Sequence, residues 1–311
     1  MLFYKKRSES DVQLNWIFIL IAGAVFLFIV FKAINFQRAS AELSASVALK
    51  SSFDAAVASS MTQEDFSGQI DVGKTGINFS CGSAILKGLN PSDLGAAFAP
   101  GGISSDSGKV IIKSEQWKFP LRISGDNPSD LADEISGRKG KDIRLVFFGQ
   151  EPTSNLLKNA SIIKIEPKIR DSINYGTVTF YSRDGSKTST YYFGDEMLIA
   201  AIYSGSIADY ECSAAKAFDR LYWILSMSQI RLANMSKAYA PGQSCNGLLN
   251  STEANSARDN ILALMSLIAP LTKDGGLRGL SEENATAIAD KVNAIESNNN
   301  LLVRFSCPSI Y

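Results

Sequence analysis

An uncharged apolar run near the N-terminus constrains this chain more than any other feature. No charged residue occurs from Val12 to Phe31 (VQLNWIFILIAGAVFLFIVF). As a helix rising about 1.5 Å per residue, the run spans about 30 Å, the thickness of the hydrocarbon core of a bilayer. Because it is apolar on every face, a membrane helix is favoured over a buried core helix. The sequence therefore predicts a transmembrane anchor at residues 12–34, in contact with the lipid bilayer.

The residues on either side of this anchor favour a cytoplasmic N-terminus. Three cations at residues 5–7 precede the apolar run, and two cations, Lys32 and Arg38, follow it. This is a small bias in the direction of the positive-inside rule. All four cysteines and all five N-x-S/T sequons follow the run, as expected for an oxidising compartment. We expect a single-pass protein of the cell membrane, with a cytoplasmic tail at residues 1–11 and the bulk of the chain extracytoplasmic.

Removal of the apolar run as a signal peptide is the alternative. Ala39-Ser40-Ala41 matches the small-x-small pattern of a signal peptidase site. However, the run is longer than the usual stretch of about 7–15 apolar residues. Two cations also separate it from the candidate site. Retention as a signal-anchor is therefore preferred.

The N-terminal segment resembles the start of an archaeal type IV pilin precursor, because a basic patch at residues 5–7, then Glu9 and Asp11, precede the apolar helix. In that family a dedicated peptidase cuts between the basic patch and the helix, and the freed helices pack into a filament core. Ser8 stands where Gly or Ala precedes the cut in the family. Residues 13–24 (QLNWIFILIAGA) are more similar to the N-termini of single-pass archaeal membrane proteins of unassigned function. The resemblance implies an archaeal surface protein.

Residues 35–62 are rich in Ala and Ser and contain neither Pro nor Gly. Ala45, Leu49, Phe53 and Ala56 recur at spacings of about one helical turn, which places them on one face. We therefore expect a stalk helix that continues the anchor. Two roles are open for it, a spacer or a packing surface for self-assembly or an envelope partner, and the spacer is preferred.

The remaining chain divides into a strand-rich region at residues 63–206 and a helical region at residues 207–311, an α+β arrangement. The clearest unit of the first region is a β-hairpin, in which Asp184-Gly185 joins strands at Thr177–Tyr181 and Thr188–Phe193. Runs of β-branched and aromatic residues predict further strands. These runs lie at residues 109–113, 117–124, 141–149 and 161–166.

The helical region has apolar residues at spacings of three, four and seven. They predict a long helix at residues 210–239, a second near residues 252–271, and a third that opens at Ser281 and ends at Asn298–Asn300. We expect these helices to pack on the β-rich region.

Four cysteines, Cys81, Cys212, Cys245 and Cys307, are expected to form two disulfides. The chain contains no C-x-x-C spacing and no histidine, which argues against a zinc or redox site. A helix of about 45 Å separates Cys212 from Cys245, too far for a bond. Helices that run up-down-up return Cys307 to Cys245. The predicted pairs are Cys81–Cys212 and Cys245–Cys307.

Sequons make asparagines candidates for N-glycosylation in an extracytoplasmic domain. Five sequons occur, at Asn78, Asn159, Asn234, Asn250 and Asn284. The candidate sites are Asn78, Asn159, Asn250 and Asn284.

Composition excludes several functions. Lys+Arg and Asp+Glu each total 31, so no basic excess is present to bind nucleic acid. The absence of His removes His-dependent triads and HExxH zinc proteases. Residues 101–109 (GGISSDSGK) have the composition of a phosphate-binding loop, but five residues instead of four separate Gly102 from Gly108. A flexible turn is the preferred interpretation.

Two carboxylate pairs, Asp195-Glu196 and Asp209 with Glu211, are candidates for the paired carboxyls of glycoside hydrolysis. A solvated helix start or a loop is the preferred interpretation of such acids. Trp117 and Tyr191–Phe193 could line a sugar-binding face, but aromatic residues in strands more often pack against one another. We therefore assign no catalytic, cofactor-binding or metal-binding residue.

The function expected from these features is that of a membrane-anchored extracytoplasmic structural, adhesive or assembly protein of the cell envelope, with a pilin-like protein as one form of it. No enzyme activity and no cofactor are expected. Two alternatives stay open: a membrane-tethered extracytoplasmic hydrolase, and an accessory subunit of an envelope or secretion complex.

Overall fold

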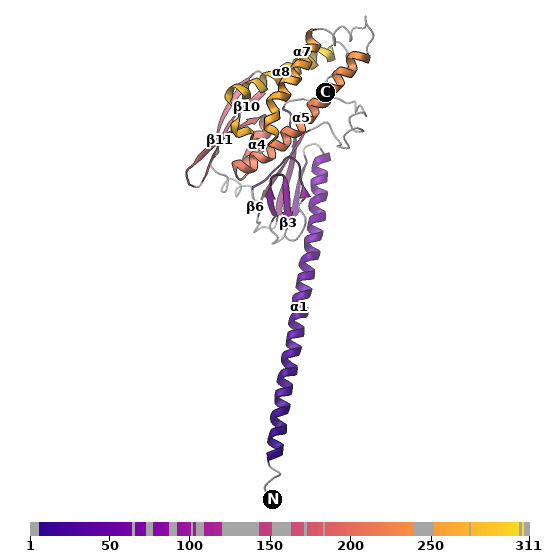
Figure 1. Cartoon of the computed structure of the whole chain (residues 1–311), viewed down its shortest axis with the longest axis vertical. Coiled ribbons are helices and arrows are strands. Elements are labelled where there is room, and N and C mark those ends of the chain that lie inside the picture. Colours follow the sequence, from indigo (N-terminus) through magenta and orange to yellow (C-terminus); the bar gives the residue numbers. More distant parts are fainter. Residues whose placement is uncertain are drawn as a thin grey trace. The chain divides into compact units, whose positions relative to one another are not determined.

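The computed structural model of the chain has an α+β fold, as predicted (Figure 1). One long helix comes first, then strands in three sheets, then C-terminal helices. The chain forms two compact units, Met1–Ser51 and Ser52–Tyr311. The structure describes residues 6–63, 66–72, 77–86, 92–100, 102–103, 109–119, 143–150, 163–170, 173–182, 184–238, 252–273, 275–304 and 307.

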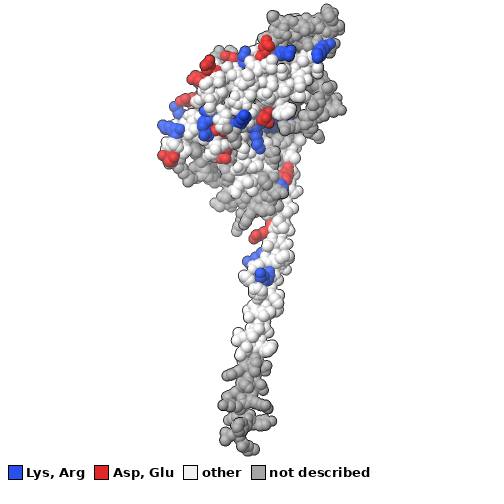
Figure 2. Space-filling view, viewed as in Figure 1, with Lys and Arg blue, Asp and Glu red and all other residues white. Residues whose placement is uncertain are grey.

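Helix α1 (Lys6–Thr62) accounts for the described part of the first unit. Its sequence contains no Pro and a single Gly, Gly23, so nothing in it interrupts the helical hydrogen bonds. The large apolar side chains from Trp16 to Phe36 are exposed, except for the half-buried Val30, and Figure 2 shows a long uncharged stretch on this helix. Within the described residues, α1 is the one helix long and apolar enough to cross a membrane.

The last turns of α1 belong to the second unit and enter its core. Phe53, Val57 and Ser60 are buried, at spacings of four and three that define one helical face. The ring of Phe53 stacks on that of Phe148 with centroids 5.6 Å apart. The hydroxyl of Ser114 donates to the carbonyl of Ser60 (2.7 Å). The end of the predicted stalk is thus a core element of the globular unit.

The predicted stripe on the stalk is only partly correct. Phe53 is buried, but Ala45 is exposed, and Leu49 and Ala56 are half-buried. The buried face continues through Val57 instead, because the sheet covers only the final turns of the helix.

The strands form three sheets. The first has the order β1 (Ser67–Asp71), β7 (Lys109–Gln116), β8 (Arg144–Gln150) and β5 (Ala97–Phe98), with only β5 and β8 parallel. The second is antiparallel, with the order β4 (Ser92–Asp93), β3 (Ser83–Leu86), β2 (Ile77–Ser80) and β6 (Gly102–Ile103). The third is an antiparallel meander of β11 (Lys187–Phe193), β10 (Ile173–Tyr181) and β9 (Ile163–Arg170).

The predicted hairpin is confirmed by the pairing of β10 with β11, which places Tyr181 opposite Lys187. Gly185 has φ +82°, the left-handed conformation that glycine adopts without steric cost. The carboxylate of Asp184 accepts a hydrogen bond from the backbone N–H of Ser186 (2.9 Å). The turn is therefore specified locally, by Asp184 and Gly185 themselves.

The strand predicted at residues 117–124 is wrong where the structure describes it. Residues 117–119 lie beyond the end of β7 and outside any strand. Trp117 and Phe119 are buried and Lys118 between them is exposed. The alternation that motivated the prediction is therefore present, although these residues lie beyond the end of β7. The rest of this predicted strand, with its edge-strand Pro120, lies outside the described residues.

The helices of the second unit are α4 (Asp195–Tyr203), α5 (Ile207–Ala238), α7 (Thr252–Ile268) and α8 (Glu282–Arg304), with short 3₁₀ segments η1 (Ala269–Thr272) and η2 (Leu277–Gly279) between α7 and α8. The predicted end of the third helix at Asn298–Asn300 is wrong, since α8 continues to Arg304. Leu302 is buried beyond the asparagines. Burial of this apolar side chain outweighs the low helix propensity of Asn.

Candidate functional site

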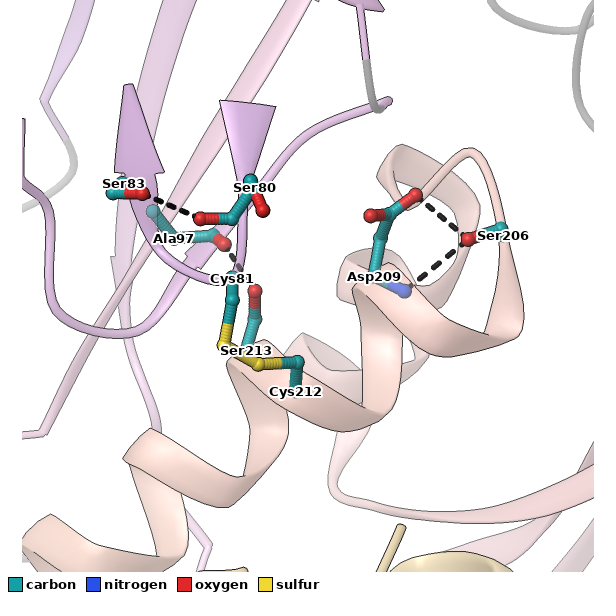
Figure 3. The surroundings of a disulfide bond; sticks show 8 residues. All are labelled: Ser80, Cys81, Ser83, Ala97, Ser206, Asp209, Cys212 and Ser213. Atoms are coloured by element: carbon teal, nitrogen blue, oxygen red, sulfur yellow. Dashed lines mark hydrogen bonds between the residues drawn. A yellow bond between two sulfur atoms is a disulfide. The ribbon is translucent and has the colours of Figure 1, made fainter. Parts of the chain in front are cut away.

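Several side chains at the start of helix α5 bind other segments of the second unit. Ser206 caps this helix: its hydroxyl donates to the carboxylate of Asp209 (2.7 Å) and accepts from the N–H of Asp209 (3.2 Å) (Figure 3). The next four residues, Tyr210–Ser213, are all buried. Four consecutive residues cover the full circumference of a helix, so this turn is surrounded by protein. We call Tyr210–Ser213 the α5 junction.

Tyr210 connects the junction to two sheets. Its hydroxyl donates to the backbone carbonyl of Tyr191 in β11 (3.0 Å). Its ring lies 6.0 Å from the rings of Phe98 in β5 and Phe180 in β10. Complete burial raises the pKa of Tyr210, so its hydroxyl stays protonated and is a hydrogen-bond donor.

Glu211 connects the junction to η2. One carboxylate oxygen lies 2.7 Å from a guanidinium nitrogen of Arg278. The Glu211 side chain is 2% exposed, whereas that of Arg278 is half-exposed. The other carboxylate oxygen, Oε1, is buried and has no hydrogen-bond partner among the described residues. Arg278 is therefore the group that compensates a buried negative charge here.

Cys212 connects the junction to the turn between β2 and β3, through a disulfide to Cys81 with a Cα–Cα distance of 5.3 Å (Figure 3). The predicted Cys81–Cys212 pair is thus present. Cys81 has φ +47°, which is uncommon for a residue other than glycine. Gly82 follows with φ +66°, and a Cβ placed there would overlap the carbonyl oxygen of Gly95. The backbone therefore reaches Cys212 only through a tight left-handed turn.

Ser213 connects the junction to β5, because its hydroxyl donates to the carbonyl of Ala97 (2.5 Å). With Lys216 it forms an S-x-x-K spacing, a pattern used by some serine acyl-transfer enzymes that the sequence analysis did not single out. A nucleophilic Ser would need an accessible hydroxyl that gives its proton to a base. Ser213 is 3% exposed and its proton is directed at a backbone carbonyl. This geometry binds α5 to β5 and does not present Ser213 as an accessible nucleophile.

The acids of the two predicted carboxylate pairs have separate environments among the described residues. Asp209 is bound to Ser206 and Glu211 to Arg278, since residues two apart on a helix face different directions. Asp195 accepts a hydrogen bond from Asn174 (2.5 Å) at the start of α4. The interpretation of these acids as a solvated helix start or loop is wrong for Glu196 and Glu211, which are both buried. Burial raises the pKa of Glu196.

The predicted aromatic residues pack in the core, as preferred, instead of lining a sugar-binding face. Trp117, Tyr192 and Phe193 are fully buried, and Tyr191 is partly buried. The indole N–H of Trp117 donates to the carbonyl of Phe193 (2.8 Å). No surface for stacking a sugar ring remains on these three side chains.

Other predicted site residues are placed as follows. Cys307 is buried and disulfide-bonded, while its predicted partner Cys245 lies outside the described residues. Gly102 lies in β6, and most of the glycine-rich segment after it is also outside them. Asn78 lies in β2, Asn234 in α5 and Asn284 in α8; Asn159 and Asn250 are outside the described residues. No group of three or more metal-ligating side chains occurs within the described ranges.

The chain matches no protein-family model, no curated protein and no solved structure. The fold and the α5 junction define it as an α+β protein with a disulfide in its second unit and, among the residues that the structure describes, one candidate membrane helix.

Proposed function

We propose that this protein is a membrane-anchored, extracytoplasmic structural, adhesive or assembly component of the cell envelope. The observation that carries the proposal is the exposed apolar stretch of α1, from Trp16 to Phe36. Exposure of this apolar surface to water would be strongly unfavourable, whereas in a bilayer the surface is solvated by acyl chains. The Cys81–Cys212 disulfide supports an oxidising compartment for the second unit. The N-terminus is then cytoplasmic, in agreement with the cations at residues 5–7.

A non-enzymatic role is supported by how the polar groups of the α5 junction are used. Glu211, Cys212 and Ser213 each bind a different segment of the unit. Residues arranged in this way contribute to stability and to resistance against unfolding. Such resistance suits a protein exposed to the exterior of a cell.

Self-assembly through the stalk is a further part of the proposal. Leu43 and Val47 lie one turn apart on α1, on the C-terminal side of the anchor, and both are exposed. A second stalk helix packed along them would bury both side chains. This agrees with a pilin-like archaeal surface protein, in which N-terminal helices pack together.

The orientation is tested by protease treatment of intact cells that express the full-length protein with an epitope tag at each end. The C-terminal tag should be lost and the N-terminal tag retained. The matched control is a variant with Lys5, Lys6 and Arg7 changed to Glu, which should lower the fraction of correctly oriented protein. Full protection of the C-terminal tag would overturn the proposal.

The role is tested by N-terminal sequencing of the mature protein and negative-stain imaging of the same fraction. Filaments that disappear in a Leu43→Glu/Val47→Glu variant would support assembly through the stalk. Copurification of a defined membrane complex at fixed stoichiometry would instead favour an accessory subunit. Hydrolysis of an envelope polymer by the purified full-length protein would favour the hydrolase.

A further inference from the structure

The sequon Asn78-Phe79-Ser80 differs from the other described sequons in its backbone conformation. It lies in strand β2, whose residues alternate between buried and exposed from Ile77 to Ser80. In a strand, residues two apart point to the same face. Asn78 and Ser80 therefore share one exposed face, while Phe79 between them is buried.

The orientation of this face is determined by packing. The ring of Phe79 lies 4.8 Å from that of Phe148 in β8 and 6.4 Å from that of Phe53 in α1. Rotation of β2 to hide Asn78 would expose this aromatic ring, at a cost of about 2 kcal/mol or more. The amide of Asn78 and the hydroxyl of Ser80 are thus kept on the surface.

The two helical sequons present their groups differently. In a helix, residues two apart lie about 200° apart around the axis and do not face each other. In α8, the Thr286 hydroxyl donates to the carbonyl of Glu282 (2.9 Å) and is paired with the hydroxyl of Tyr175 (3.1 Å). The Thr286 hydroxyl is therefore engaged by other groups, while the N–H of Asn284 donates to the Ser281 hydroxyl (3.2 Å). Asn234 is in the interior of α5 and has the same helical geometry.

We propose that Asn78 is a site of N-glycosylation, a modification that rests on the extracytoplasmic location proposed above. The donor is a polyprenyl-phosphate-linked or polyprenyl-diphosphate-linked oligosaccharide. The Asn78 side-chain nitrogen forms a bond to C1 of the first sugar, and the bond from C1 to the phosphate oxygen breaks. The amide proton passes to a base of the transferase, and the lipid phosphate leaves.

The strand opposite Asn78 offers a contact for the first sugar. Asn78 is paired with Ile85 of β3, and Cβ atoms of directly opposite residues lie about 4.5–5.5 Å apart. Ile85 is 40% exposed. A sugar attached to Asn78 would cover part of this side chain.

The proposal is tested by mass spectrometry of glycopeptides from the full-length protein, purified from its own cells. We expect a glycan on the peptide that contains Asn78, and its complete loss in Asn78→Gln and in Ser80→Ala. Ser80→Thr keeps the hydroxyl and should retain the glycan. Asn284→Gln is the matched control and should leave the glycan pattern unchanged.

Two results would overturn the proposal. One is an unmodified Asn78 in a protein whose second unit is shown by protease to lie outside the cell. The other is a glycan that persists in Ser80→Ala. If protease shows that the second unit lies inside the cell, the proposed function fails too. Protease treatment of the same cells therefore distinguishes failure of the glycosylation proposal alone from failure of both proposals.

Discussion

Glu211 and Cys212 are adjacent on the first turns of α5, and their side chains hold segments from opposite ends of the second unit. Glu211 binds Arg278, 67 residues later in the chain, and Cys212 is bonded to Cys81, 131 residues earlier. One helical turn thus closes two long loops. The disulfide persists in the unfolded chain and lowers its conformational entropy, whereas the ion pair acts only in the folded state.

Removing the disulfide should destabilise the full-length protein. In a Cys81→Ser/Cys212→Ser variant in detergent, urea unfolding should show a free energy of unfolding lower by about 2–5 kcal/mol, because the unfolded chain gains freedom. The single variant Cys81→Ser also lacks the bond and should lose a similar amount. Equal stability of wild type and double variant would show that the bond does not constrain the unfolded state.

Gly82 and Gly185 form a matched pair, because both have positive φ and only Gly82 is crowded. Gly185→Ala should cost about 1–2 kcal/mol, the penalty of a left-handed conformation. Gly82→Ala should cost about 3 kcal/mol or more, since its Cβ would also overlap the Gly95 carbonyl oxygen. Thermal unfolding and quantification of free thiols check both variants. Similar losses in the two would contradict the close approach of Gly82 to Gly95.

Breaking the ion pair should leave the Glu211 carboxylate buried and uncompensated. Arg278→Gln should lower the free energy of unfolding by about 1–3 kcal/mol. This loss is smaller than that expected on breaking a fully buried ion pair, because Arg278 is half-exposed. The exposed Arg258 of α7 provides the control, and Arg258→Gln should change stability by less than about 0.5 kcal/mol. Adding Glu211→Gln to Arg278→Gln should recover part of the loss. A double variant less stable than Arg278→Gln alone would argue against a buried charge.

Two tryptophans distinguish core packing from surface exposure. Trp117 is 2% exposed and donates to the Phe193 carbonyl, whereas Trp223 is 52% exposed. Trp117→Phe should cost about 2–4 kcal/mol, from the lost hydrogen bond and the smaller ring. Trp223→Phe should cost less than about 0.5 kcal/mol. Denaturant unfolding followed by far-UV circular dichroism compares them, and equal losses would contradict the assignment of Trp117 to the core.

Glu196 should make stability depend on pH. Burial is the main cause that raises its pKa, with Asp195 and Glu115 adding to the shift and Lys118 opposing it. The folded state then holds this proton more tightly than the unfolded state. The free energy of unfolding should therefore fall as pH rises from the unfolded pKa, about 4.3, through the raised folded pKa, and then level off.

The variant Glu196→Gln should lack this part of the pH dependence, and so should gain stability relative to wild type as pH rises from 4 to 7. Glu283→Gln, at an exposed position in the first turn of α8, is the control and should keep the wild-type slope. Urea midpoints measured across this pH range provide the comparison. Parallel curves for wild type and Glu196→Gln would contradict burial of the ionised carboxyl.

Features specified by neighbouring residues could be predicted from the sequence. The Asp184-Gly185 turn and the paired strands around it follow from backbone preferences and alternation. The long helix of residues 207–238 follows from its apolar spacing. Even the Cys81–Cys212 pair could be reached, because the length of a rigid helix excludes one alternative and its direction disfavours another.

Features that depend on contacts between distant segments could not be predicted from the sequence. The three asparagines at 298–300 indicate a helix end, and burial of Leu302 beyond them decides that α8 continues. Similarly, Glu196 appears as one of two solvated acids, and only the surrounding core shows that it is buried.

The sequence by itself determined the apolar stretch of α1, the α+β order of the elements and the β10–β11 hairpin, because each depends on patterns within a few turns or strands. The tertiary structure alone decided that the end of α1 is a core element and that Tyr210–Ser213 bind four separate segments. The physical reason is range: propensity and periodicity act between neighbours, whereas burial and pairing depend on which distant surfaces meet.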